Sequence, residues 1–219
     1  MPIALLEQTI RRCTRCDQNL SRYGVVPRPI FGGGADLPIV LIGQAPGRTE
    51  YENNAPFRGD AGKSIRALFA ASGLADFDNH VYQTSVTKCF PGRLPKASTD
   101  RVPSVAEVAN CLPFLIQQLE LIRPKLIVCL GGLSWRAFLS VKEDEQPGFC
   151  ASVLDIRKPA EVRVPHMVGR RFDWNQSLVL PMIHPAGSAN GSRAAYPEED
   201  SRSKVLLRAS FIEIGVGVT

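Results

Sequence analysis

The chain has 219 residues, of which 44% are hydrophobic and 21% charged, so it can bury a substantial core and is neither fibrous nor disordered. Its longest apolar runs, residues 38–42 and 126–130, are too short to cross a bilayer, and its first residues lack the pattern of a signal peptide, so we expect a cytoplasmic protein with no membrane partner. The net charge of +5 fits a polyanionic partner such as nucleic acid and equally fits ordinary solubility.

The first chemical motif along the chain is a cysteine pair, Cys13 and Cys16, just after a short N-terminal helical stretch. Two further cysteines, Cys89 and Cys111, flank a loop rich in proline, glycine and basic residues. Cysteines of a protein that is not exported stay reduced, which favours metal ligation over disulfides. The four thiolates therefore predict a tetrahedral site for zinc or an iron–sulfur cluster, one that ties the N-terminus to the middle of the fold.

Short apolar runs alternate with helical patterns along the rest of the chain. Buried strands are predicted at residues 38–43, 80–86, 126–130 and 178–183. Helices are predicted at residues 61–73, 104–122, 133–139 and 201–214. This alternation predicts an α/β fold, a three-layer α/β/α sandwich with a mostly parallel central sheet. We expect one domain over residues 1–219, in which residues 141–177 elaborate one sheet edge.

In such sheets the ligand site lies at the carboxyl ends of the strands, so the candidate loops are residues 44–60, 87–103 and 184–193. The run from Gly43 to Gly47 lets a backbone pass close to a ligand and is equally compatible with a structural turn. Phe57 could fill the core or stack on a base. His184, followed by proline, is the one histidine of the chain at a strand end where chemistry is expected.

Other motifs are excluded or assigned to the core. Residues 59–64 resemble half of a Walker A loop, but Phe57 stands where that loop requires glycine, which excludes a nucleoside triphosphatase. The three glycines at residues 32–34 precede the first strong strand, so we expect a flexible turn and not a dinucleotide loop. Cys129 lies in an apolar strand and is a core residue, whereas Cys150 has no evident partner.

Six motifs follow one another along the chain in a recognisable order. They are Cys13-x-x-Cys16, Gly43-Gln-Ala-Pro-Gly47-x-x-Glu50, Pro56-Phe57-x-Gly59-x-Ala-Gly62, Thr84-Ser-Val-Thr-Lys-Cys89, Pro103 to Cys111, and His184-Pro185. Over residues 13–193 this order resembles the uracil-DNA glycosylase superfamily and is most similar to its iron–sulfur branch, family 4. The resemblance implies a [4Fe–4S] cluster held by the four cysteines and a partner that is uracil-containing DNA, single- or double-stranded.

The resemblance also implies a role for each residue of the base pocket. Phe57 would stack on a uracil flipped out of the DNA. Glu50 would crowd the position of a thymine methyl group, and the backbone at Gln44 would bond uracil O2 or O4. His184 would donate a hydrogen bond to O2 as the leaving uracil gains negative charge. Ser85 would read the base where family 4 usually has asparagine.

Several positions depart from the family pattern. Ala45 replaces the aspartate that orients the attacking water in the best-known branch, so we take Asp60, beside Phe57, as the candidate water-positioning residue. The residues after His184-Pro185 are small, so none of them can insert between the bases of a duplex. Their small side chains would let a DNA phosphodiester approach the backbone N–H groups. The expected phosphate contacts are Ser188, Ser192 and Arg193. Residues 89–102 contain no histidine, so the covalent trapping of DNA seen in some relatives is not expected.

The sequence thus predicts a monomeric, monofunctional DNA glycosylase, an enzyme that hydrolyses the N-glycosidic bond of deoxyuridine in DNA and leaves an abasic site for base-excision repair. Two alternatives remain open. One is a catalytically weak or inactive protein of the same fold that binds DNA damage, which Ala45 and Ser85 would suit. The other is a zinc-stabilised nucleic-acid module without a base pocket.

Overall fold

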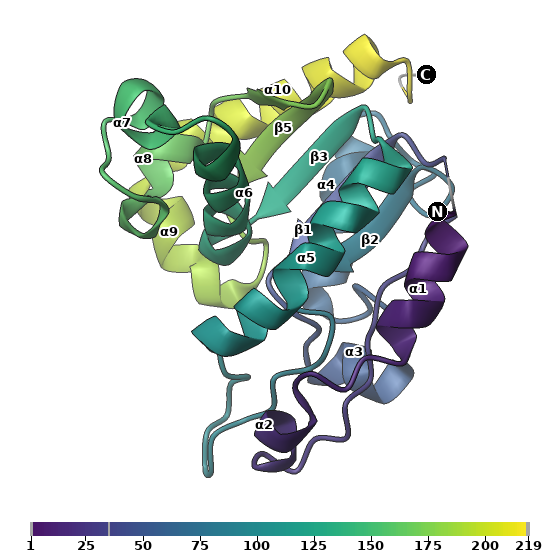
Figure 1. The fold of residues 1–219 in the computed structure, drawn as a ribbon. Helices are drawn as coiled ribbons and strands as arrows, with labels where there is room; N and C mark the ends of the chain where they lie inside the picture. Colours follow the sequence, from purple (N-terminus) through teal and green to yellow (C-terminus); the bar gives the residue numbers. More distant parts are fainter. Residues whose placement is uncertain (1, 35, 218–219) are drawn as a thin grey trace.

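A computed structural model of the chain describes residues 2–34 and 36–217. Its centre is a five-stranded sheet with the strand order β2-β1-β3-β5-β4 (Figure 1). The strands are β1 (Ile39–Gly43), β2 (Val81–Ser85), β3 (Leu126–Leu130), β4 (Phe172–Trp174) and β5 (Ser177–Met182). All neighbours pair in parallel except β4, which runs antiparallel to β5 at one edge. The predicted mostly parallel sheet is confirmed.

Helices cover both faces of the sheet. One face carries α1 (Ile3–Arg11), α5 (Val105–Ile122), α6 (Gly132–Glu145) and α7 (Phe149–Leu154), and the other carries α4 (Asp60–Ala71) and α10 (Pro197–Ile214). Because successive strand residues point to opposite faces, β1 supplies both cores. Val40 and Ile42 pack under the first group of helices, whereas Ile39 and Leu41 pack under the second. The three-layer sandwich predicted from the sequence is therefore confirmed.

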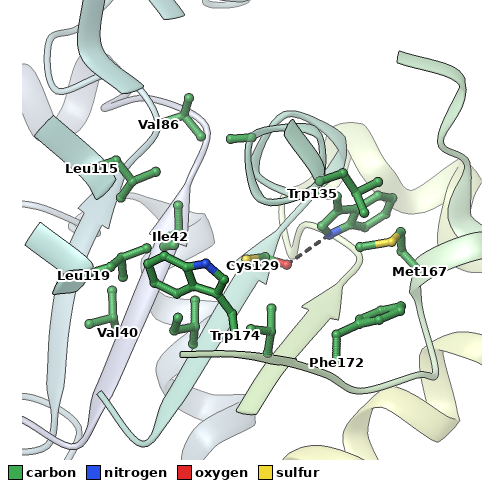
Figure 2. Packing of buried hydrophobic residues seen from close by; sticks show 14 of the residues in the cluster. Val40, Ile42, Val86, Leu115, Leu119, Cys129, Trp135, Met167, Phe172 and Trp174 are labelled. Atoms are coloured by element: carbon green, nitrogen blue, oxygen red, sulfur yellow. Dashed lines mark hydrogen bonds between the residues drawn. The ribbon is translucent and has the colours of Figure 1, made fainter. Parts of the chain in front are cut away.

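Figure 2 shows the first of these cores, in which aromatic side chains fill the space between β3, α6 and the edge of the sheet. The indole of Trp135, on α6, donates a hydrogen bond of 3.0 Å to the carbonyl oxygen of Cys129, on β3. Trp174, on β4, packs in the same cluster. Cys129 is completely buried there, as expected of a core cysteine. This packing fixes α6, whose N-terminus borders the carboxyl edge of the sheet.

A capping box starts α5, since Ser104 and Glu107 accept hydrogen bonds from each other's backbone N–H groups. Among the described residues, α5 is the one helix whose length and apolar composition would suit a membrane span. Its apolar side, which includes Phe114, Leu115 and Leu119, packs in the core on the sheet. We therefore assign α5 to the core of the fold.

Some boundaries differ from the prediction. Helix α6 continues to Glu145 because Val141 still contacts the core, and α10 begins at Pro197, a residue type that suits the first turn of a helix. The segment 141–177 contains the end of α6, α7, α8 (Val164–Met167) and the edge strand β4. Short helices not predicted from the sequence are α2 (Asp17–Ser21), α3 (Arg48–Asn53) and α9 (Asn190–Ala195).

The prediction of a flexible turn at residues 32–34 was wrong. Gly32 exchanges two backbone hydrogen bonds of 2.9 and 2.7 Å with Gln83, so this segment lies along the free edge of β2. Gly33 has φ 133°, and a Cβ there would come within 2.8 Å of the α-carbon of Tyr82. Gly33 is therefore needed for the close packing of these two backbones.

The strand order determines where a ligand can bind. The chain passes from β1 to β2 on one side and then crosses to β3 on the other side of β1. Loops that leave neighbouring strands in opposite directions open a crevice at the carboxyl edge, and ligands of such sheets bind there. In this chain the crevice lies beside Gly43 at the end of β1 and Gly131 at the end of β3.

Candidate active site

A cleft of about 670 Å³ lies at this carboxyl edge, a volume typical of small-molecule sites. The loops after β1, β2, β3 and β5 line it, together with part of the segment between β2 and α5. The structure brings six of the residues singled out in the sequence into this one cleft, namely Gln44, Glu50, Phe57, Asp60, Ser85 and His184. They come from segments that are up to 140 residues apart in the chain.

Gly43 holds two of these side chains close together. A Cβ on Gly43 would lie 3.2 Å from Cζ of Phe57 and 3.6 Å from Oγ of Ser85. Both side chains therefore pack against the bare α-carbon at the end of β1. The floor of the cleft consequently offers a flat aromatic ring and a hydroxyl group at neighbouring positions, a combination suited to a planar polar ring.

The backbone of Phe57 is in the left-handed region, with φ 49°, which is unusual for an aromatic residue. The start of α4 enforces this conformation. A Cβ on Gly62 would lie 2.0 Å from the carbonyl oxygen of Phe57, so only glycine lets the helix approach so closely. Gly62, in the motif Gly59-x-Ala-Gly62, thus has a packing role that fixes the ring of Phe57.

Glu50 organises the cleft wall more than the sequence suggested. One carboxylate oxygen accepts the backbone N–H of Gly47 at 3.0 Å. The other accepts those of Arg58 at 2.9 Å and Gly59 at 2.7 Å. Because these are charge-assisted bonds to two different loops, the side chain fixes the loop after β1 against the segment that carries Phe57. This positioning role is additional to the predicted crowding of a thymine methyl group.

His184 follows β5 and is held as a neutral hydrogen-bond donor. Its Nδ1 accepts the backbone N–H of Ala186 at 3.1 Å, so the proton of the neutral ring resides on Nε2. Burial lowers the pKa of His184 below its ordinary value, and the positive charge of Arg193 lowers it further. Gly131 permits this packing, because a Cβ there would lie only 3.2 Å from Cβ of His184.

The loop after His184 is more structured than expected. Residues 187–189 form a 3₁₀ turn and α9 follows directly, so the segment 184–193, predicted as a loop, is partly helical. The guanidinium of Arg193 donates to the carbonyl oxygens of His184 at 2.6 Å and Ala186 at 3.2 Å, and also bonds the side chain of Asn190. These bonds shape the loop and leave little of the guanidinium for a phosphate.

The remaining predicted residues are placed less favourably. The side chain of Asp60 is 96% exposed and pairs with Lys63 at 3.1 Å, which does not favour a role in positioning a buried water. Ser192 is half-buried on α9 and is not among the residues that line the cleft. The side chain of Ser188 lies outside the part of the chain that the structure describes.

The four predicted cysteines line one common cavity beside the cleft. Cys111 accepts the backbone N–H of Lys88 at 3.4 Å, and Cys16 accepts the side-chain amide of Asn110 at 3.5 Å. Burial raises the pKa of Cys89 to about 12, and it also raises the pKa of Cys16 and Cys111. Over residues 2–34 and 36–217, no three Cys, His, Asp or Glu side chains converge closely enough for a single metal ion.

Lys88 lies between the cavity and the cleft and was missed in the sequence analysis. It is 1% exposed, and its ammonium donates to the carbonyl oxygen of Ser85 at 2.5 Å. Burial lowers its pKa to about 8. The signal that could have found it is its position, three residues after the end of β2 and directly before Cys89. Gly131 and Gly132, which also line the cleft, could have been found because they follow a buried strand.

Comparisons with known proteins agree on one family. The family model of the uracil DNA glycosylase superfamily matches residues 30–206. A type-4 uracil-DNA glycosylase of Thermotoga maritima is 31% identical over 209 residues, which cover 93% of this chain and 94% of the relative. A type-4 enzyme of Archaeoglobus fulgidus is 33% identical over 81% of this chain and 78% of its own. A type-5 uracil-DNA glycosylase of Pyrobaculum aerophilum is 33% identical over 50% of this chain and 51% of its own.

We predict that His184 titrates below pH 6.5 in an NMR experiment, because burial and Arg193 disfavour its charged form. The unfolded chain then binds more protons below pH 6.5, so this histidine reduces stability as the pH falls through that value. Arg193→Gln should raise the pKa of His184 by removing the positive charge, and Arg193→Lys should raise it less. A wild-type titration at or above pH 6.5 would contradict the proposed neutral donor.

We predict that Glu50→Gln lowers the free energy of unfolding by about 1–2 kcal/mol, since an amide group cannot accept all three backbone hydrogen bonds. Urea denaturation measures this loss. Glu52→Gln is the matched control, because Glu52 is on the same helix and forms only an exposed ion pair with Arg48; its loss should stay below about 0.5 kcal/mol. Equal losses in the two variants would refute the positioning role of Glu50.

Proposed function

This chain belongs to the uracil-DNA glycosylase superfamily, and we propose that it hydrolyses the N-glycosidic bond of deoxyuridine in DNA, which leaves an abasic site for base-excision repair. The observation that carries the proposal is the neutral imidazole of His184, with its proton on Nε2, in the same cleft as Phe57 and Ser85. A DNA glycosylase needs such a donor beside a platform for a planar base.

Binding begins with extrusion of the uracil from the strand into the cleft. There its ring stacks on Phe57, whose backbone is held by Gly62, and the hydroxyl of Ser85 bonds a polar edge of the base. The backbone around Gln44, at the end of β1, bonds uracil O2 or O4. Because these groups are fixed before the base arrives, little ordering is required on binding.

In the chemical step the bond between C1′ and N1 breaks, and its electron pair goes to the uracil. Nε2–H of His184 donates to uracil O2, where negative charge accumulates, in the manner of an oxyanion hole. The deoxyribose becomes cationic, and the phosphates of the DNA stabilise that charge. Water then adds to C1′ and releases a proton. Ala45 supplies no carboxylate for this water, and the exposed position of Asp60 makes it a weak candidate.

In this proposal Glu50 excludes thymine from the cleft and also holds the two loops in position. Its carboxylate lines the cleft, where it would crowd the methyl group of thymine and so protect normal DNA. Because its oxygens are bonded to the backbone of Gly47, Arg58 and Gly59, the side chain cannot easily swing away to admit that methyl group.

We propose that Cys13, Cys16, Cys89 and Cys111 hold a [4Fe–4S] cluster. All four cysteines line one cavity, as the thiolate ligands of a shared metal group must. Thr87 also lines this cavity, and its buried hydroxyl has no hydrogen-bond partner among the described residues, as expected of a donor directed at a cluster sulfur. The cluster would cross-link the N-terminal segment to β2 and α5 and supplies no step of the hydrolysis.

We further infer that the chain acts as one domain over residues 1–219, as a monomer on DNA in the cytoplasm. Both cores share one sheet, which supports a single unit. A rival function for the same cleft is binding of uracil or abasic sites without turnover, which the absence of an acid at Ala45 would favour. The two readings differ in whether the glycosidic bond is cleaved.

We predict that the protein cleaves a labelled single-stranded oligonucleotide with one central uracil, revealed as strand scission after alkali. His184→Ala should lower kcat by about 10²–10³-fold, the typical loss of one oxyanion donor. His166→Ala, which removes a histidine of α8 outside the cleft, is the control and should retain full activity. Tight binding without cleavage by the wild-type protein would favour the damage-binding rival.

We predict that protein purified without oxygen is brown and absorbs near roughly 400 nm, as expected of thiolate-bound iron. Cys89→Ser should lose this absorbance together with most of its iron. Cys150→Ser is the control, since Cys150 is a free cysteine like Cys89 but lies outside the cavity, and the absorbance of this variant should not change. A colourless wild-type protein that contains one zinc ion would contradict the cluster.

A further inference from the structure

The segment between β2 and α5 projects from the carboxyl edge of the sheet (Figure 1). Several of its residues, from Arg93 to Val102, line the cleft. Its outermost part, residues 94–96, is exposed. Arg93 and Thr99, on either side of this tip (residues 94–97), line the cleft, so the tip lies beside the rim of the proposed base pocket.

The tip forms a tight turn. The backbone N–H of Ala97 donates to the carbonyl oxygen of Leu94 at 3.0 Å, and Pro95 restricts the first corner of the turn. Lys96 has φ 63°, the left-handed conformation that the third position of such a turn requires. The side chain of Leu94 is 54% exposed. A branched apolar side chain is thus presented to solvent by a turn with few alternative conformations.

The base of the same segment is anchored. Arg93 pairs with Asp100 at 2.6 Å, and the backbone N–H of Arg101 donates to the carbonyl oxygen of Gly92 at 3.0 Å. Asp100 also accepts the backbone N–H of Arg48 at 3.1 Å, which ties the base to the start of α3. The tip is therefore fixed relative to the wall of the cleft that Glu50 organises.

A glycosylase that extrudes a base from a duplex leaves a gap in the stack, and apolar side chains commonly fill such gaps. The residues after His184-Pro185 cannot do so, because residues 186–190 carry only small side chains and one asparagine. Among the described residues, Leu94 and Val102 are the large exposed apolar side chains on the segment that forms the cleft wall, and Val102 lines the cleft itself.

We propose that Leu94 is the wedge that inserts into the duplex where the uracil has left, with the ammonium of Lys96 beside a neighbouring phosphate. This inference rests on the proposed glycosylase function. Residues 94–99 contain no acidic side chain, so nothing in the tip repels the DNA backbone. A single strand has no stack to open, so the wedge acts on duplex substrates alone.

The test compares Leu94→Ala with the wild-type protein on the same uracil oligonucleotide, single-stranded and paired. On the duplex, kcat/KM should fall roughly 10- to 100-fold, the factor expected from the loss of one buried leucine side chain. On the single strand it should stay within about twofold, because no stack is opened there. Leu94→Met should restore most of the duplex activity. Val205→Ala, at a 66% exposed position on α10, is the control and should change neither.

A second measurement does not depend on turnover. In the His184→Ala background, the fluorescence of 2-aminopurine next to uracil should rise when the duplex is bound, and Leu94→Ala should abolish most of that rise. Equal losses of activity on both substrates, or an unchanged fluorescence rise, would overturn the wedge. If the wild-type protein failed to cleave either substrate, the proposed function would fall, and the fluorescence would still decide whether Leu94 opens the duplex.

Discussion

The carboxylate of Glu50 accepts three backbone hydrogen bonds from two loops, and the geometry of the cleft depends on this clamp. The loop after β1 and the segment that carries Phe57 have no other common side-chain support of this kind among the described contacts. Glycines make the clamp possible, because a Cβ on Gly47 would lie 2.8 Å and one on Gly59 3.2 Å from its oxygens. The spacing of the glycines from Gly43 to Gly62 therefore determines the backbone geometry of the cleft wall, and this geometry positions the ring of Phe57.

The electrostatics of His184 follow from its surroundings in the same way. A protonated imidazole would be a stronger donor, but it would also have to be desolvated beside the guanidinium of Arg193. Arg193 is held in place by the carbonyl oxygens of the loop that it supports, so its charge is part of the fold. A neutral donor with a fixed Nε2 proton avoids that cost, and in the proposed reaction it would still meet the charge that develops on the leaving uracil.

The sequence predicted the sheet, both helical layers and the residues of the cleft, because buried strands and strand-end motifs have strong local signals. It could not predict contacts that depend on segments brought together by folding. The clamp by Glu50, the occupied guanidinium of Arg193 and the exposure of Asp60 are of this kind. The short helices α3 and α9 were missed because one turn of helix has little periodicity, and tertiary packing decides whether it forms.

The cysteine cavity and the cleft share one short stretch of chain, and this explains why a cluster remote from the chemistry would matter to it. Ser85 ends β2, and Cys89 follows four residues later. Between them, the buried ammonium of Lys88 holds the carbonyl oxygen of Ser85, while its backbone N–H bonds Cys111. Nearby negative charge favours the charged form of a lysine buried to this extent, and thiolates bound to iron would supply that charge. The proposed cluster would therefore hold Ser85, the proposed base-reading residue, in position through Lys88.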